Sequence, residues 1–108
     1  MSMIADYMRE RAGRQTIENH TGFAAFEISG DVCYLADIYV KPEFRRSHMA
    51  TLLADQVVMT AKQEGCTKLL GSVETKANNV TESLKTVLSY GFKFERLDDT
   101  VLYFIKEI

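Results

Sequence analysis

The stretch from Cys33 to Leu53, CYLADIYVKPEFRRSHMATLL, decides the fold of this chain. Its first eight residues are mostly apolar or aromatic, and they suit a half-buried strand. Pro42 is the only proline, and it cannot continue a ladder of strand hydrogen bonds. The sequence therefore predicts a strand that begins near Cys33 and ends by Lys41.

An amphipathic helix is predicted directly after this strand. Four apolar residues follow the spacing of one helix face: Met49, Leu52, Leu53 and Val57. Ser47 is suited to cap the first turn and Gly65 to end the last, so we expect a helix from about Ser47 to Glu64. The basic turn RRSH over residues 45–48 then lies at the helix N-terminus. Free backbone N–H groups and two arginines at such a place favour a phosphate.

These residues resemble the signature of the GNAT acyltransferase family, in which a strand ending V-x-P-E-[YF]-R is followed by [QR]-x-x-G-x-[GA] and a helix. The chain reads VKPEFR over residues 40–45 and RRSHMA over residues 45–50. His48 stands where the family has its first glycine, and Ala50 fills the second small position. The alternative interpretation is an ordinary exposed turn between a strand and a helix.

The resemblance implies acetyl coenzyme A as the co-substrate. In the family the amides of this turn hold the pyrophosphate, and the last residues of the strand pair with the pantetheine arm. The residues that this pattern implies are Ile38, Tyr39, Val40, Arg45, Arg46, Ser47, His48, Met49 and Ala50. Asn79 is close to the asparagine that opens a later helix of the family and helps to hold coenzyme A. Plain helix capping is the alternative role, and both can hold at once.

The acceptor side is predicted on the same strand. An acyl transfer from a thioester to an amine needs a neutral amine, a polarised carbonyl and a proton for the leaving thiolate. Residues 34–40, YLADIYV, resemble the Y-L-E-D-[LF]-[YF]-V strand of polyamine acetyltransferases, with Ala36 in place of the glutamate. Asp37 shares a strand face with Tyr39, and both are candidates for catalysis. A carboxylate paired within the fold is the alternative role of Asp37.

Tyr90 is the candidate general acid. The family helix ends in Y-x-x-x-G-F, and residues 87–92 read VLSYGF, so that Val87 occupies the tyrosine position. Tyr90 lies nearly one turn away, and core packing is its alternative role. The resemblance thus predicts an N-acetyltransferase that transfers an acetyl group to a primary amine, of a small molecule or a protein, by direct attack in a ternary complex. The replaced glutamate and tyrosine motivate the alternative, a catalytically weak or inactive GNAT-fold module for binding or assembly.

The rest of the chain predicts an α/β fold of order α-β-β-α-β-α-β-β, with a mixed sheet and helices on both faces. The expected elements besides the helix after Pro42 are a helix from about Ser2 to Arg14, an antiparallel hairpin of strands 22–28 and 32–40, a parallel strand over 68–73, a helix between Asn79 and Gly91, and a terminal hairpin of strands 92–97 and 100–105. The resemblance covers about residues 22–108. The first strand of the family is either absent or hidden in residues 16–21.

Composition excludes several classes of function. The 108 residues with a formal net charge of −2 predict one compact domain over 1–108, without a general attraction for nucleic acid or membranes. Two cysteines make no disulfide framework, no residues have metal-ligand spacing, and no apolar run reaches the roughly 20 residues of a membrane span. The stretch from Met1 to Arg14 lacks the apolar region of a signal peptide, so we expect a cytoplasmic protein. The exposed edges of so small a sheet favour a homodimer.

Overall fold

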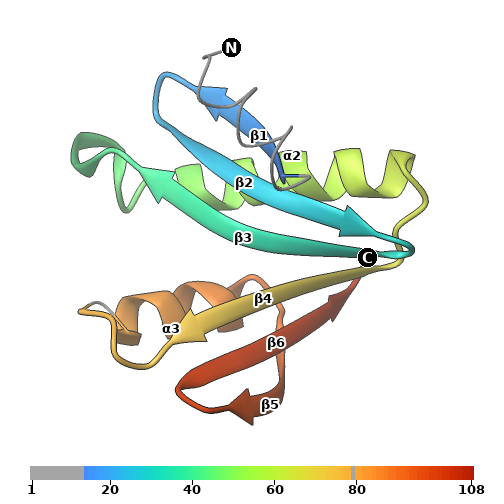
Figure 1. Ribbon diagram of the computed structural model, residues 1–108. Helices are drawn as coiled ribbons and strands as arrows, with labels where there is room; N and C mark the ends of the chain where they lie inside the picture. Colours follow the sequence, from blue (N-terminus) through green and yellow to red (C-terminus); the bar gives the residue numbers. More distant parts are fainter. Residues whose placement is uncertain (1–13, 79) are drawn as a thin grey trace.

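A computed structural model describes residues 14–78 and 80–108 (Figure 1). These residues form six strands, two α-helices and a short 3₁₀ helix. In chain order the elements are β1 (Arg14–Asn19), β2 (Gly22–Ser29), β3 (Val32–Val40), η1 (Pro42–Phe44), α2 (Met49–Gln63), β4 (Lys68–Glu74), α3 (Val80–Ser89), β5 (Lys93–Asp98) and β6 (Val101–Glu107). Over the described ranges, neither helix has the length and apolar character to cross a membrane.

The strands form one mixed sheet in the order β1-β2-β3-β4-β6-β5. The pairs β1/β2, β2/β3, β4/β6 and β5/β6 are antiparallel, whereas β3 and β4 are parallel. The predicted hairpins and the parallel pairing of the strand after the long helix are therefore confirmed. Gly65 and Gly91 both have positive φ angles directly after the two α-helices, as expected for helix-ending glycines.

The two described helices lie on the same face of the sheet, behind the strands in the view of Figure 1. The hydroxyl of Tyr90, next to α3, donates a hydrogen bond of 2.6 Å to Asp55 of α2, which requires both helices on one side. The connections β3-α2-β4 and β4-α3-β5 join parallel strands and advance in the same direction across the sheet, so right-handed crossovers put both helices on one face. The expectation of helices on both faces is not met by these two.

The core fills the space between α2 and the sheet. Its largest fully buried side chains are Phe26, Leu53, Leu69, Val57 and Cys33, from α2 and the three strands β2, β3 and β4. Val80, Leu84 and Val87 form an apolar stripe along α3 and pack against the same cluster. Burial of this apolar surface is the main stabilising contribution to such a fold.

Strand β1 corrects the sequence interpretation of its region. Arg14, expected at the end of a first helix, is the first residue of β1 and forms an ion pair of 2.7 Å with Glu27 of β2. The strand runs to Asn19, so part of residues 16–21, where a hidden strand was considered, does form a strand. It is joined to β2 by a short turn. Its polar residues hide the period of two that would have revealed it. The remainder of the expected first helix, before Arg14, lies outside the described residues.

Strands β3 and β4 pair for only part of their length. Their Cα partners run from Val32 and Lys68 to Leu35 and Gly71, although β3 continues to Val40 and β4 to Glu74. At the same point β3 has a bulge against β2, because Ala25 pairs with Asp37 and Phe26 with Leu35, which leaves Ala36 without a partner. A bulge bends its strand and increases its twist. The two central strands therefore diverge towards their C-terminal ends, as Figure 1 shows.

Candidate functional site

A cavity of about 680 Å³ lies where β3 and β4 diverge. Its walls come from the bulge of β3, the buried face of β4, the N-terminus of α2 and one side of α3. The polar or charged residues along it are Asp37, Arg45, Arg46, His48, Thr51, Ser72, Glu82, Ser83, Thr86 and Ser89. The volume suits a small-molecule ligand, for which sites usually measure about 300–1,000 Å³.

The turn before α2 brings free backbone donors to this cavity. Arg46 and His48 both adopt left-handed conformations, with φ of 62° and 64°, and His48 takes the position before the first helical residue. The first amide paired within the helix is that of Leu52, which donates to the carbonyl of His48 at 3.1 Å. The amides of Met49 and Ala50 therefore lack a partner within the helix, and they lie beside the positive end of its dipole.

Ser47 does not cap this helix, contrary to the sequence prediction. Its hydroxyl instead donates a hydrogen bond to the carbonyl oxygen of Phe44, and no side chain caps α2. The helix begins at Met49, two residues later than expected, because the left-handed His48 interrupts the helical path at the turn. The first-turn amides are thereby left open to a ligand.

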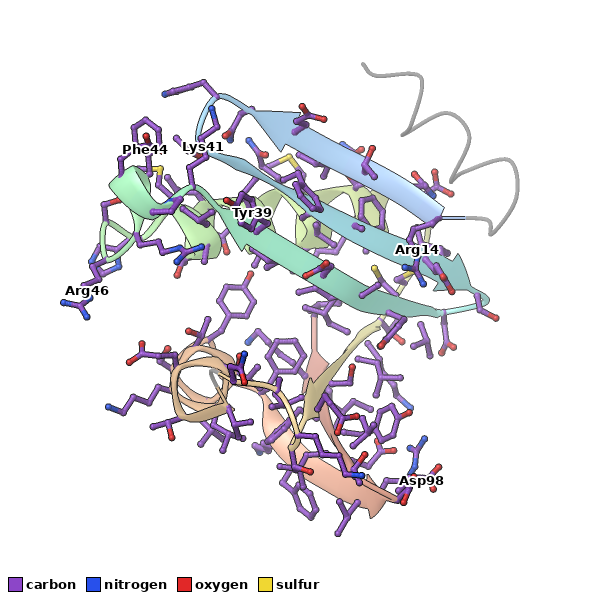
Figure 2. All side chains as sticks on the ribbon, turned by 60° about the vertical axis from the view of Figure 1, so that its left-hand side comes forward. Arg14, Tyr39, Lys41, Phe44, Arg46 and Asp98 are labelled. Carbon is purple, nitrogen blue, oxygen red and sulfur yellow. The ribbon has the colours of Figure 1, made fainter. Side chains whose placement is uncertain are left out.

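The two arginines of the turn have different surroundings. Arg45 donates a hydrogen bond from Nε to the carbonyl oxygen of Val40 at 2.9 Å, and its guanidinium lies 5.7 Å from the centre of the Tyr39 ring. The side chain of Arg46 is exposed and points away from the sheet at the outer end of the turn (Figure 2). Arg45 therefore fastens the turn to the end of β3, whereas Arg46 remains available to an anion.

Most of the predicted cofactor residues line the cavity. Those that do are Ile38, Val40, Arg45, Arg46, His48, Met49 and Ala50. Tyr39 and Ser47 are not among its lining residues. Asn79 lies outside the described residues. The structure therefore brings the last residues of β3 and the first turn of α2 to the same cavity.

Asp37 lies on the sheet face opposite the helices. Ile38 and Val40 pack into the core on the helix side, so the alternation of β3 turns Asp37 and Tyr39 the other way. Asp37 is exposed and borders the cavity, and Tyr39 stacks on Phe23 of β2 with ring centres 5.8 Å apart. The cavity thus extends along β3 as far as Asp37, whose side chain lies on the other face of the sheet.

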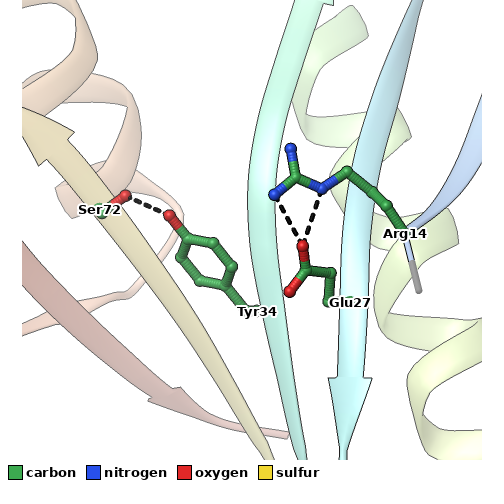
Figure 3. A network of polar contacts seen from close by, with 4 residues as sticks. All are labelled: Arg14, Glu27, Tyr34 and Ser72. Atoms are coloured by element: carbon green, nitrogen blue, oxygen red, sulfur yellow. Dashed lines mark hydrogen bonds and ion pairs between the residues drawn. The ribbon is translucent and has the colours of Figure 1, made fainter. Parts of the chain in front are cut away.

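The hydroxyls of Tyr34 and Ser72 join β3 to β4 near the start of this gap. They share a hydrogen bond of 2.8 Å (Figure 3). Tyr34 is two residues before the bulge, and Ser72 directly follows Gly71, the last residue of β4 that pairs with β3. The pair therefore holds the two strands together just before they diverge.

Tyr90 is placed differently from the predicted general acid. Its hydroxyl is held by the carboxylate of Asp55, and its ring borders a small apolar pocket between α2 and α3. Burial, and then the hydrogen bond with Asp55, raises the pKa of Tyr90 above its ordinary value. A higher pKa makes the phenol a weaker proton donor. Val87 lines the larger cavity.

Four polar residues of α3 that sequence reasoning did not assign to the site also line the cavity: Glu82, Ser83, Thr86 and Ser89. Ser83 and Thr86 are three residues apart and lie beside the apolar stripe of this helix. A search of the sequence for polar residues next to that stripe would have found them.

The two thiols lie in the core, and neither lines the cavity. Burial, followed by the charge of Cys66, raises the pKa of Cys33 to about 12. Burial also raises the pKa of Cys66. Because the thiolate is the nucleophilic form, neither cysteine is suited to covalent catalysis at neutral pH.

The diverging central strands above an open helix N-terminus define a GNAT-type fold and site. The chain belongs to the acetyltransferase (GNAT) family, whose model matches residues 4–92. The chain is 36% identical over 77 residues to the aminoglycoside N(6′)-acetyltransferase type 1 of Acinetobacter baumannii, in an alignment that covers 71% of this chain and 49% of the relative. It therefore spans about half the length of that relative. The family predicted from residues 34–50 and 87–92 is confirmed.

Solved structures confirm the mixed α/β fold. A putative GNAT acetyltransferase from Desulfovibrio desulfuricans has a TM-score of 0.81 with 16% identity, covering 94% of this chain and 74% of that one. The PaiA N-acetyltransferase of Thermoplasma acidophilum, in complex with coenzyme A, has a TM-score of 0.78 with 18% identity, covering 94% of this chain and 66% of that one. At these identities the likeness concerns the fold.

Proposed function

We propose that this chain binds acetyl coenzyme A in the cavity between β3 and β4 and transfers the acetyl group to a primary amine by direct attack in a ternary complex. The observation that carries the proposal is that one cavity joins the gap between the diverging strands to the open N-terminus of α2. The first of these features suits an extended chain, and the second suits a phosphate. Acetyl coenzyme A has both parts, and its thioester would supply an activated acetyl group.

The cofactor would be held chiefly by the backbone. The amides of Met49 and Ala50 and the side chain of Arg46 would bind the pyrophosphate. The backbone groups of β3 beyond Leu35 do not pair with β4, and they would bind the pantetheine arm through hydrogen bonds of the kind that strands make. This arrangement directs the thioester towards the bulge at Ala36.

The acceptor amine would approach from the opposite face of the sheet, where Asp37 lies. An exposed carboxylate attracts a protonated amine and can orient it as it loses its proton. The relative from Acinetobacter baumannii is named for an aminoglycoside. We therefore place amino sugars first among the acceptors to be tested, followed by polyamines and peptide amines.

The side chains around the cavity favour direct attack by the amine over an acetyl-enzyme intermediate. Both cysteines are buried with raised pKa values and lie away from the cavity. With Ala36 and Val87 in place of the family's glutamate and tyrosine, positioning supplies most of the catalysis. Orientation of two reactants is worth about 7–11 kcal/mol of a barrier, whereas acid–base help contributes about 10²–10⁴-fold. We therefore expect slow but measurable turnover.

The test is release of free coenzyme A thiol from acetyl coenzyme A in the presence of each amine, with mass spectrometry of the product. Binding is measured separately, because acetyl coenzyme A at about 100 times its Kd should raise the free energy of unfolding by about 2.7 kcal/mol. Stabilisation without thiol release from any amine would identify a binding module instead. If acetyl coenzyme A produces neither stabilisation nor thiol release, the cofactor site itself is refuted.

A further inference from the structure

Strand β5 presents an open edge at the rim of the sheet (Figure 1). It pairs with β6 on one side, and within the described residues no strand pairs with its other side. All six of its residues are exposed, including Phe94 at 56% and Leu97 at 59%. Backbone donors and acceptors on such an edge are a template for another strand.

The sequence of this strand, KFERLD over Lys93–Asp98, is complementary to its own reverse. Two antiparallel copies in the register that centres on the 95/96 peptide place Lys93 opposite Asp98, Phe94 opposite Leu97, and Glu95 opposite Arg96. Each opposition joins either two opposite charges or two apolar side chains. Cross-strand pairs of both kinds stabilise a sheet.

The bulge of β5 makes this register geometrically consistent. Residues directly opposite in an antiparallel pair share one face, yet in a regular strand Lys93 and Asp98 would lie on different faces. Here Glu95 has no partner on β6, because Phe94 pairs with Phe104 and Arg96 with Tyr103. The extra residue shifts the alternation by one position.

The pairs with β6 show the resulting faces. Lys93, Arg96 and Asp98 pair with Ile105, Tyr103 and Val101, which are alternate residues on one face of β6. Phe94 and Leu97 pair with Phe104 and Leu102 on its other face. Both the charged pair and the apolar pair of the self-complementary register are thus matched in face.

The central charges are already arranged on the surface. Arg96 and Glu95 form an ion pair of 2.6 Å, although they are neighbours in sequence, and the guanidinium of Arg96 lies 4.3 Å from the centre of the Tyr103 ring. Asp98 lies at the end of β5, beside the turn to β6 (Figure 2). At a two-fold axis, the four charges of two Glu95–Arg96 pairs alternate in sign.

We propose that two copies of this chain associate through β5, edge to edge and antiparallel, with Lys93 opposite Asp98 and Phe94 opposite Leu97. The axis is a two-fold, so the same patch serves both copies and the contact closes on itself. We choose a second copy as the partner because the sequence of β5 is complementary to the same sequence running in the opposite direction. An unrelated strand would not require this self-complementarity. The two sheets become one continuous sheet, and the cavities between β3 and β4 remain outside the contact. The inference does not depend on the proposed function.

A charge-reversal series tests the contact by sedimentation velocity over a range of protein concentrations. We expect the unchanged chain to dimerise. Lys93→Glu alone and Asp98→Lys alone each place like charges opposite one another twice per dimer, and each should raise the dimer Kd about tenfold. The double variant, Lys93→Glu with Asp98→Lys, restores both pairs and should return the Kd to that of the unchanged chain. Lys62→Glu, on the exposed last turn of α2, is the matched control and should change nothing.

Pairs of engineered cysteines test the strand register of the dimer contact directly. Phe94→Cys combined with Leu97→Cys should form covalent dimers under oxidation, with a 94-to-97 linkage in mass spectrometry. Lys93→Cys with Leu97→Cys places the thiols on different faces and should not form dimers efficiently. A chain that stays monomeric up to millimolar concentration would overturn the proposal. A dimer that is indifferent to the charge reversals, or that links equally well in both cysteine variants, would overturn it too.

Discussion

The guanidinium of Arg45 is bound to the carbonyl oxygen of Val40, five residues earlier in the chain, at the end of β3. This hydrogen bond closes the turn that carries Arg46 and His48 to the N-terminus of α2. It also separates the roles of two adjacent arginines that the sequence presents as equals.

Arg45→Ala should destabilise the fold. The substitution removes a hydrogen bond donated by a charged group, and because the group is exposed we expect a loss of about 1 kcal/mol in the free energy of unfolding. Urea unfolding of the variant, beside Lys62→Ala as an exposed control, measures it. Equal stability of the two variants would show that the turn holds its shape without this bond.

Arg46→Ala should weaken acetyl coenzyme A binding and leave the stability of the free protein unchanged. The side chain is exposed and free to meet a phosphate, so its contribution to binding should shrink as salt concentration rises. Calorimetry at low and high salt measures both effects. A loss of affinity that is independent of salt would indicate a structural role instead.

His48→Gly should stabilise the turn and preserve or improve cofactor binding. His48 has a φ of 64°, a conformation that costs a side-chain-bearing residue about 1–2 kcal/mol relative to glycine. Glycine would also remove the side chain beside the first helical amides. His48→Ala is the matched control, because it removes the imidazole but keeps the strained backbone. A large loss of affinity in both variants would show that the imidazole contacts the ligand.

Asp37→Asn should lower acetylation of amines while the affinity for acetyl coenzyme A stays nearly unchanged. Asp37 is exposed and borders the cavity, so we expect the substitution to leave the fold intact. We expect a fall in kcat/KM of about 10²-fold or more if the carboxylate orients or deprotonates the amine. Asp99→Asn, in the turn between β5 and β6, is the control. Unfolding of the Asp37 variant would instead assign its carboxylate a structural role.

Tyr90→Phe should destabilise the fold more than it slows the reaction. It removes the hydrogen bond to Asp55 that joins α3 to α2, which is worth about 1 kcal/mol. The pKa of Tyr90 is raised in the folded chain, so its contribution is present below about pH 10, the ordinary pKa of tyrosine, and is lost as pH rises further.

Urea unfolding across that range should therefore show the two proteins converging in stability at high pH. In the kinetic assay we expect kcat to change by less than the 10²–10⁴-fold typical of a lost general acid. A drop of that size with unchanged stability would assign Tyr90 the catalytic role predicted from the sequence.

Local sequence patterns determined much of this protein. Pro42 marked the end of β3, and the spacing of Met49, Leu53 and Val57 predicted which face of α2 is turned to the core. Leu52, which was predicted on the same face, is 51% exposed. Gly65 and Gly91 marked the helix ends because positive φ angles favour glycine. The basic turn between strand and helix identified the family and the place of the candidate phosphate site.

The tertiary structure decided what local patterns do not encode. The polar strand β1 is held by its pairing with β2 and by the ion pair between Arg14 and Glu27. Its own sequence lacks the alternation of apolar and polar residues that would have predicted it. The divergence of β3 from β4 depends on the bulge at Ala36, which is defined by pairing with another strand and not by its own residues. The hydrogen bond between Tyr90 and Asp55 joins residues 35 positions apart in the chain. These are long-range choices of pairing and direction, and they are settled when the sheet and its helices pack together.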